Sequence, residues 1–281
     1  MKQSLQYGAP AATLLVALAA CLFSSTARAN PRPLPFSYPY ETLPSGKFEA
    51  EQYLDLVPVR VTRENPDGTQ EGVFSLRSVL QTELEIGLSD RLEFGWYFVF
   101  AQGASAETPF LRFQGVKQRL RLRLAEEGDW PVNVGLYLEV AEFHNEFEVE
   151  EKLLLSRRFG PLNLVVNLWI EQEYYFQTSE TKFIFNPTAG VTYELSPHVI
   201  IGAEYWARGR FDSTSDESDE PGASDAPTGT RHYLGPTVVL QTGEAWLSLA
   251  PYLRLDALGD DWVVDDPYGK VWFRALMGYG F

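Results

Sequence analysis

The sequence predicts an all-β fold: an antiparallel transmembrane β-barrel of about twelve strands, with both termini periplasmic. Three observations predict it. The chain begins with an export signal, alternating segments of about ten residues repeat between turn residues, and residues 269–281 form an amphipathic strand that ends on an aromatic residue. An even number of strands brings both ends of a barrel to one rim, so both termini are expected on the same side.

The export signal occupies residues 1–29. An apolar run, 9–23, follows a positively charged start, and Ala27-Arg28-Ala29 provides a small-residue cleavage site. Cleavage there leaves Asn30 first and removes the only cysteine, so no disulfide is expected. A rival site ends at Cys21, which lipoprotein processing would lipidate. We prefer the Ala29 site because a leucine is a poor residue to follow a lipidated cysteine.

The processed chain, 30–281, is acidic. It loses Lys2 and Arg28 and no acid, so 21 basic residues (23 minus 2) oppose 38 acidic ones, a net charge of −17. Such acidity argues against a nucleic-acid partner. No run of eighteen apolar residues follows the signal, so no transmembrane helix is expected. No linker-like stretch divides residues 46–281, which we interpret as one outer-membrane barrel domain.

Residues 30–45 lie between the signal and the barrel. They hold five prolines, which favour an extended chain without internal hydrogen bonds. We therefore predict a proline-rich periplasmic lead, too short to be a separate plug domain.

The first six strands alternate apolar residues with charged, polar or aromatic ones, the period of a half-buried strand. A turn signal, Asn65-Pro66-Asp67-Gly68, lies in a longer loop between the first two strands. The six strands are expected at about 46–57, 74–86, 92–100, 116–124, 132–140 and 147–158.

The other six strands are expected at about 162–173, 182–195, 199–208, 231–241, 245–255 and 270–281. Short turns alternate with longer polar loops, the longest of them spanning 211–230, as a membrane barrel requires. Closure is forced because lipid offers no partner to an unpaired backbone group. The outward aromatic residues expected in interfacial girdles are Phe94, Phe98, Phe100 and Tyr279.

Four residues fit this scheme poorly. Glu151 falls on the lipid-facing side of its strand, and Pro187, Pro236 and Pro251 remove donors from strands of a sheet that has no edge. We expect bulges or shifted strand boundaries at these positions. A secreted β-sandwich or lipocalin-like barrel stays open as the soluble alternative.

Charged residues concentrate on the face expected to line the lumen. Lys117, Arg119, Arg121 and Arg123 form a ladder of cations about 7 Å apart along one strand face. Such a ladder could guide anions through a pore. The alternative is internal pairing with the acids of the same face. Those acids are Glu83, Glu85, Glu93, Glu139, Glu171, Glu173 and Glu204.

No catalytic centre, metal site or cofactor is predicted, so we do not expect an enzyme. None of His144, His198 and His232 stands in a His-x-Ser-Asn run, which outer-membrane phospholipases share. The three histidines are expected at opposite rims, which disfavours a shared metal. The acids between Asp212 and Asp225 do not have EF-hand spacing and are expected to form a solvated surface loop.

Two resemblances bear on function. The final strand, with Tyr279 and the terminal Phe281, resembles the assembly signal of bacterial outer-membrane barrels. Residues 82–94 and 190–197, each with a strand that leads into a Leu-Ser-x turn, resemble outer-membrane proteins named after the meta-pathway of phenol degradation. That resemblance covers about half of the chain and implies a transporter-like protein, sometimes linked to uptake of aromatic compounds. It defines no substrate residues.

The sequence thus predicts a channel or transporter-like barrel of the Gram-negative outer membrane for small molecules, aromatic or hydrophobic compounds among them. The expected partners are outer-membrane lipid, lipopolysaccharide, the barrel-assembly machinery and a small-molecule solute. A non-conducting structural or surface barrel and an outer-membrane lipid-modifying enzyme remain the alternatives. Whether the lumen is open depends on how the inward side chains pack.

Overall fold

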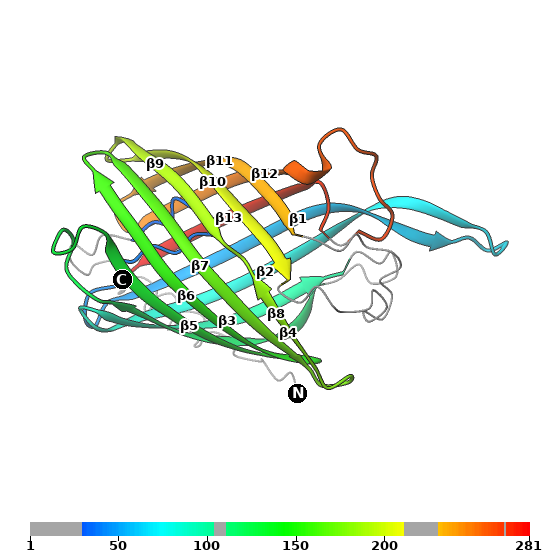
Figure 1. The fold of residues 1–281 in the computed structure, drawn as a ribbon, viewed down its shortest axis with the longest axis horizontal. Coiled ribbons are helices and arrows are strands. Elements are labelled where there is room, and N and C mark those ends of the chain that lie inside the picture. The colour runs from blue at the N-terminus through cyan, green and yellow to red at the C-terminus, as the bar shows by residue number, and fades with distance from the viewer. Residues whose placement is uncertain (1–29, 104–110, 211–229, 267) are drawn as a thin grey trace, which may run out of the picture.

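In a computed structural model, the chain forms a closed antiparallel β-barrel (Figure 1). The structure describes residues 30–103, 111–210, 230–266 and 268–281. The predicted signal peptide, 1–29, and the acids between Asp212 and Asp225 lie outside the described residues.

The strands follow one another around the barrel in chain order. Their bounds are β1 (Phe48–Glu64), β2 (Gln70–Ser89), β3 (Leu92–Gln102), β4 (Arg112–Arg123), β5 (Asn133–Phe143), β6 (Glu146–Phe159), β7 (Leu162–Tyr175), β8 (Glu180–Phe185), β9 (Thr188–Ser196), β10 (Val199–Arg210), β11 (Arg231–Thr242), β12 (Ala245–Arg254) and β13 (Val271–Gly280). A short 3-10 turn, η1 (Leu255–Ala257), follows β12. No helix in the described part of the chain is long and apolar enough to cross a membrane.

The prediction of twelve strands is confirmed. β8 and β9 both pair with β7 and with β10, and the register continues from β8 into β9 on both sides, so together they make a single strand of the barrel. β13 closes the ring by pairing with β1. At this seam the backbone N–H of Phe48 donates to the carbonyl of Phe281 (3.1 Å), and the Phe281 N–H donates back to Phe48 (2.9 Å).

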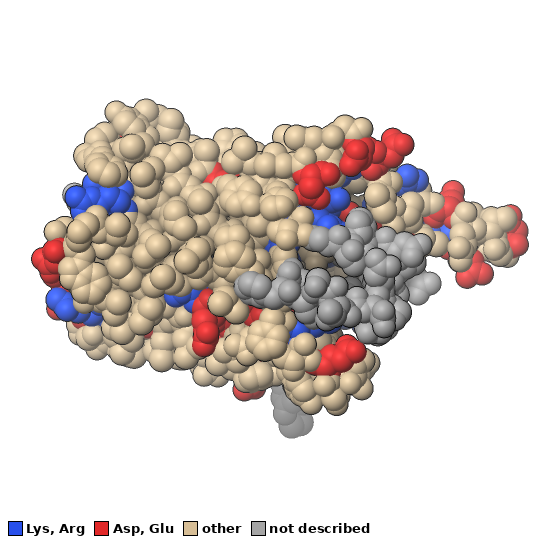
Figure 2. All heavy atoms as spheres, in the orientation of Figure 1, with Lys and Arg blue, Asp and Glu red and all other residues tan. Residues whose placement is uncertain are grey.

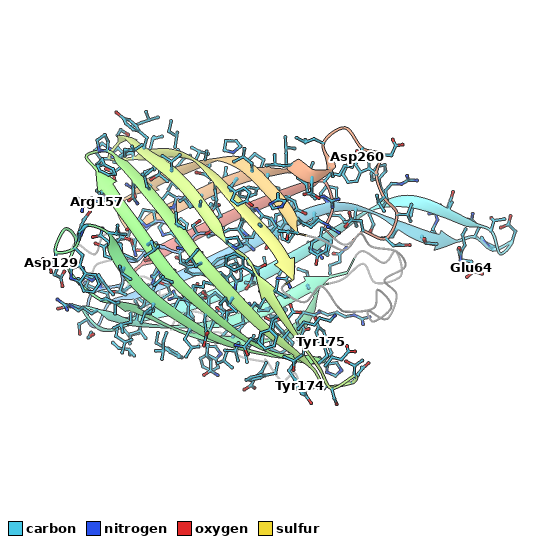
Figure 3. All side chains as sticks on the ribbon, viewed as in Figure 1. Glu64, Asp129, Arg157, Tyr174, Tyr175 and Asp260 are labelled. Carbon is cyan, nitrogen blue, oxygen red and sulfur yellow. The ribbon has the colours of Figure 1, made fainter. Side chains whose placement is uncertain are left out.

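The barrel has two different rims. We call the edge with the short β2–β3, β6–β7, β9–β10 and β11–β12 turns the turn rim; it also carries the chain's C-terminal end (Figure 1). The opposite edge is the loop rim. There the β1–β2 hairpin runs beyond the other strands to its tip beside Glu64, whereas Asp129 and Arg157 mark the turn rim (Figure 3).

Alternation along each strand gives the barrel its two faces. Leu84, Trp96, Leu120, Leu138 and Leu168 are among the exposed apolar side chains of the outer face. Figure 2 shows this wall as largely uncharged between ends that carry most of the visible acids and bases. The inner face instead buries acids, bases and tyrosines. An apolar outer surface around a polar interior is the pattern of a barrel that meets lipid.

The expected bulge at Glu151 is wrong. Glu151 pairs with Leu138 on β5 and with Ile170 on β7, and the register is unbroken along both ladders. Its side chain is therefore exposed on the outer wall, five residues from the loop-rim end of β6. A glutamate costs less on a lipid-facing wall than an arginine or lysine, and less still away from the midplane.

The expected bulges or shifted boundaries are wrong at Pro236 and Pro251, whereas at Pro187 a strand boundary does fall, between β8 and β9. Pro236 and Pro251 lie opposite each other, in a gap of the β11–β12 ladder with the same register on both sides. Two missing donors thus fall at one place in the sheet. Pro187 separates β8 from β9, yet its carbonyl accepts from the N–H of Ala207 (3.0 Å), and the register continues past it.

Residues 30–45 lie inside the barrel, which corrects the prediction of a lead that extends into the periplasm. Arg32, Leu34, Phe36, Tyr38 and Tyr40 are all buried. We call this segment the lumen segment. Its apolar and aromatic side chains lose contact with water inside the barrel, which favours this position over an extended one outside.

The closure seam makes the C-terminal residue a test of assembly. Phe281 stacks on Phe48 (ring centroids 5.8 Å apart), so Phe281→Asp should weaken the β1–β13 seam and lower the amount of folded barrel in the outer membrane. Phe176→Asp, at the loop rim, is the matched control and should change the yield little. Heat-modifiable gel mobility of membrane fractions measures both; equal yields would contradict the role of Phe281 as an assembly signal.

Candidate functional site

The candidate site is the barrel lumen, because the structure places all seven predicted acids and the cation ladder on its inner face. Of the ladder, Arg119 and Arg121 are buried, whereas Lys117 and Arg123 are partly exposed. The alternation of β4 fixes this arrangement, since from Gly115 to Arg123 its odd-numbered residues point inward and its even-numbered residues outward.

Arg119 is the centre of the inward charge network. Its guanidinium donates to Glu83 (2.6 Å) and Glu85 on β2, to Glu93 (2.7 Å) on β3 and to the Tyr97 hydroxyl (2.9 Å). None of these groups is appreciably exposed to water. A buried guanidinium with several carboxylate partners is satisfied, whereas removal of one partner leaves uncompensated charge. Internal pairing therefore accounts for Arg119.

The rest of the ladder is paired as well. Arg121 donates to both oxygens of Glu93 (2.7 and 2.9 Å), and Lys117 donates to Glu139 (2.9 Å). Arg123 instead lies at the turn rim, where it pairs with Glu126 (2.9 Å). The four cations thus lie at successive levels of the barrel and are all paired, with Glu93 shared between Arg119 and Arg121.

A second network lies across the lumen on β7 and β10. Arg208 binds Glu171 (3.1 Å) and Glu173 (2.6 Å), and the Asn186 amide also donates to Glu171 (2.7 Å). Glu204 lies apart from these acids. It accepts from the Tyr252 hydroxyl and from the lumen segment.

The lumen segment is held by side chains of the barrel wall. Glu204 accepts from the backbone N–H of Phe36 (3.1 Å) and of Ser37 (2.6 Å). Asn167 accepts from the Tyr38 N–H (2.6 Å) and donates to the Tyr38 carbonyl (3.1 Å). Nearer the turn rim, Glu93 accepts from the Leu43 N–H (2.7 Å). Buried backbone groups that have no strand partner are satisfied in this way.

We call the part of the lumen segment around Phe36 and Ser37 its apex. Aromatic packing holds this apex in place. The Phe36 ring stacks on Trp206 (4.2 Å) and meets Tyr252 edge-on (5.3 Å). The Arg274 guanidinium lies 3.7 Å from the centre of the Phe36 ring. Arg274 is itself fixed by Asp55 (2.6 Å), so one wall of the lumen offers a preformed aromatic and cationic cradle.

Two inward glycines make room for the lumen segment. A Cβ on Gly87 would lie 2.1 Å from the Pro44 carbonyl oxygen, and one on Gly190 would lie 2.6 Å from Leu34. Glycine inside a strand marks a close approach of another part of the chain. These glycines were the sequence signal for an occupied lumen, and sequence reasoning missed them together with Arg32, Glu150 and Lys152.

Arg77 differs from the other inward cations and was also missed. It pairs with Val57 in the β1–β2 ladder and lies nearer the loop rim than Glu83. Within the described residues its guanidinium has no ion-pair or hydrogen-bond partner, and its Nε is buried and unsatisfied. Its nearest recorded contact is the Trp272 ring, 5.3 Å away. A half-buried, unpaired cation beside aromatic rings is suited to binding an anion.

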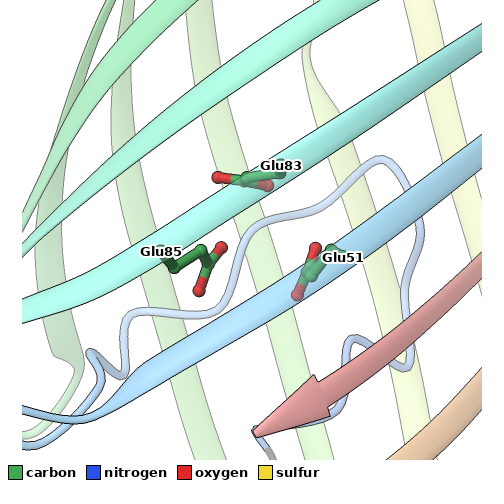
Figure 4. A group of neighbouring side chains, drawn as sticks. All are labelled: Glu51, Glu83 and Glu85. Atoms are coloured by element: carbon green, nitrogen blue, oxygen red, sulfur yellow. The ribbon is translucent and has the colours of Figure 1, made fainter. Parts of the chain in front are cut away.

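Two groups of inward carboxylates are close enough to hold a cation: Glu51, Glu83 and Glu85, and Glu148, Glu171 and Glu173. Figure 4 shows the first group with the lumen segment running beside it. Arg32 and Arg119 already pair with the three acids of that group, and Arg208 binds two acids of the second. His144 and His232 lie at the loop rim and His198 at the turn rim, so they form no common site.

Comparisons with known proteins reveal similarity at the level of structure. No protein-family model matches the sequence, and no curated protein matches it either. An outer membrane channel from Pseudomonas putida F1 is similar in structure, with a TM-score of 0.60 and 13% identity over 86% of this chain and 98% of that one. The NanC porin has a TM-score of 0.50 and 9% identity over 80% of this chain and 98% of its own. The chain therefore has the fold of an outer-membrane channel or porin barrel.

Because Arg119 binds three buried acids, a single substitution of this residue should strongly lower the stability of the barrel. Arg119→Gln should lower the free energy of unfolding by about 3–5 kcal/mol, because Glu83, Glu85 and Glu93 then share an uncompensated buried charge. Arg63→Gln removes the exposed pair with Glu71 and should cost less than about 0.5 kcal/mol. Urea unfolding in liposomes, followed by tryptophan fluorescence, measures both.

The double change Arg119→Glu and Arg121→Glu distinguishes a paired network from a free ladder. Full pairing predicts loss of the folded barrel without a clean change in ion selectivity. A stable barrel whose reversal potential shifts toward cations would instead show that these arginines face water and act on passing ions.

Proposed function

We propose that this protein is a Gram-negative outer-membrane channel for small molecules whose lumen is closed by its own residues 30–45. Solute passage then requires the lumen segment to leave its place, at least in part. The fold supports the channel, and the side-chain contacts of the lumen segment support the closure.

The way in which the lumen segment is bound carries the proposal. In the described residues from 30 to 43, no backbone group forms a hydrogen bond with the backbone of a strand. The side chains of Glu204, Asn167 and Glu93 bind the backbone of this segment instead. Docking of an extended, proline-rich segment against aromatic side chains is one way in which proteins bind peptide ligands. Such a segment can leave without breaking the barrel's own ladders, and the groups it releases are polar enough to be hydrated.

The orientation and partners belong to the same proposal. The turn rim with its short turns faces the periplasm, and the loop rim faces outward, as in outer-membrane barrels. Outer-membrane lipid and lipopolysaccharide surround the wall, and the barrel-assembly machinery recognises Tyr279 and Phe281. We propose transport and no catalysis. A non-conducting surface barrel and a lipid-modifying enzyme are the competing functions.

The inner face also suggests a solute class. Arg77 is an unpaired cation close to Trp272, and Trp272 is part of the aromatic cluster around Phe36. Small aromatic carboxylates combine a ring that stacks with an anion that binds a guanidinium. This fits the resemblance to the proteins named after the meta-pathway of phenol degradation, which remains part of the proposal.

Locking the apex of the lumen segment tests the proposed route. The Ser37 and Thr188 hydroxyls are 2.7 Å apart, so Ser37→Cys with Thr188→Cys should form a disulfide in the cysteine-free processed chain. The oxidised protein should lose conductance in planar bilayers, and reduction should restore it to the wild-type level. Removal of residues 31–44 should raise conductance above wild type, with the heat-modifiable barrel retained.

Each single-cysteine variant is the control for the locked protein and should conduct as wild type does. Equal conductance of the oxidised, reduced and shortened proteins would exclude the lumen as the route. A shortened protein that folds and stays silent under every solute would favour the non-conducting barrel.

Arg77 tests the solute class. Arg77→Gln should weaken binding of benzoate about tenfold or more, because a charge-assisted contact is worth about 1.5–3 kcal/mol. Benzyl alcohol, which keeps the ring and lacks the charge, should bind both proteins alike. Tryptophan fluorescence titrations measure the affinities, with Arg63→Gln as the control; equal benzoate affinity in all three proteins would contradict a role for Arg77.

A further inference from the structure

A group of five buried carboxylates lies on β1, β2 and β3 next to the lumen segment: Glu49, Glu51, Glu83, Glu85 and Glu93. Among the residues that the structure describes, three arginines pair with them. Arg32 binds Glu51 (3.3 Å), Arg119 binds Glu83, Glu85 and Glu93, and Arg121 binds Glu93. The group is therefore short of positive charge.

Glu49 is the acid that lacks a cation. Among the described residues no basic side chain pairs with it, although it is only 1% exposed. It accepts a hydrogen bond from the indole N–H of Trp246, and its other recorded donor is the backbone nitrogen of Asn30, 3.2 Å from Oε2. A buried carboxylate with no cation is costly unless a charged partner is supplied.

Asn30 is also the residue that follows the predicted cleavage site. Hydrolysis of the Ala29–Asn30 bond by a signal peptidase consumes one water and leaves a carboxylate on Ala29 and an amine on Asn30. An α-amino group has a pKa of about 7.7–8.0, so it is mainly protonated at neutral pH. The same nitrogen then carries three donors and a positive charge instead of one amide N–H.

We propose that export processing after Ala29 creates a structural ion pair between the Asn30 α-ammonium and the buried Glu49 carboxylate. This ion pair supplies the missing cation and fixes the free end of the lumen segment. The other end is fixed at the turn rim, where the Ser45 N–H donates to Asp90 (3.1 Å) and the chain continues into β1. The lumen segment is then anchored to the barrel wall at both ends. Processing at Cys21 would leave Asn30 as an amide and the loop without this anchor. The proposal does not depend on solute passage.

An insertion that keeps the export pathway but moves the new amine tests the ion pair. Ser-Gly-Ser placed between Ala29 and Asn30 leaves a mature chain in which the Asn30 nitrogen is again an amide. The wild type, the extended protein, Glu49→Gln and the combination of both changes form a double-mutant cycle. All four proteins are purified from outer membranes, and N-terminal sequencing confirms where each mature chain begins. Thermal unfolding and chymotrypsin cleavage after Phe36 and Tyr40 are measured for each.

The ion pair predicts that the extension lowers the midpoint temperature by several degrees and speeds cleavage several-fold when Glu49 is present. Both effects should nearly vanish in the Glu49→Gln background. Independent, additive effects, or no effect of the extension, would overturn the proposal, as would a membrane protein that begins at a lipidated Cys21. If Glu49→Gln does not fold, the Asn30 amine of the wild-type chain is treated with cyanate at neutral pH. Strong protection relative to a peptide supports the ion pair, and peptide-like reactivity refutes it.

Discussion

The closed sheet imposes the constraint on which the rest of the structure depends. Lipid cannot hydrogen-bond a strand edge, so β13 must return to β1, and the number of strands then sets the width of the interior. About eight strands enclose a space that side chains fill, whereas about sixteen to eighteen leave an aqueous channel. Twelve strands fall between these cases. Inward side chains and the lumen segment together fill a space that neither would fill alone.

Filling that space with charge has its own consequence. Once the lumen segment excludes water, each inward acid needs a partner within reach. Arg119, Arg121 and Arg208 are the partners of Glu83, Glu85, Glu93, Glu171 and Glu173. The lumen segment supplies Arg32 to the same network. Removing the segment would let water replace its contacts, so the closed and open states exchange one set of hydrogen bonds for another. Apolar side chains on the inner wall would not allow this exchange, because they form no hydrogen bonds with the lumen segment or with water.

The alternation of apolar and polar residues was enough to predict the barrel fold and which side chains point inward or outward, because a single strand already displays this alternation. It placed Arg119 and Glu83 inward correctly, and strand pairing then explained why they meet. It failed where the outcome depends on parts of the chain that are distant in sequence. Pro236 and Pro251 looked like breaks, yet they share one gap because their strands are neighbours. The proline-rich segment looked external, although Gly87 and Gly190 leave space for it on the inner wall.

The position of the apex indicates how a solute and the lumen segment would compete. Phe36 stacks on Trp206, and Trp272 joins that cluster to the side chain of Arg77 nearer the loop rim. A solute that enters from the loop rim and binds Arg77 with its anion brings its ring against the same aromatic surface. A ligand shifts a conformational equilibrium only by its difference in affinity between the two states. Competition for Trp206 and Trp272 supplies that difference, because the ring of the solute gains the surface that Phe36 gives up. Anchors at both ends of the segment would let the apex withdraw while the loop as a whole stays in the barrel.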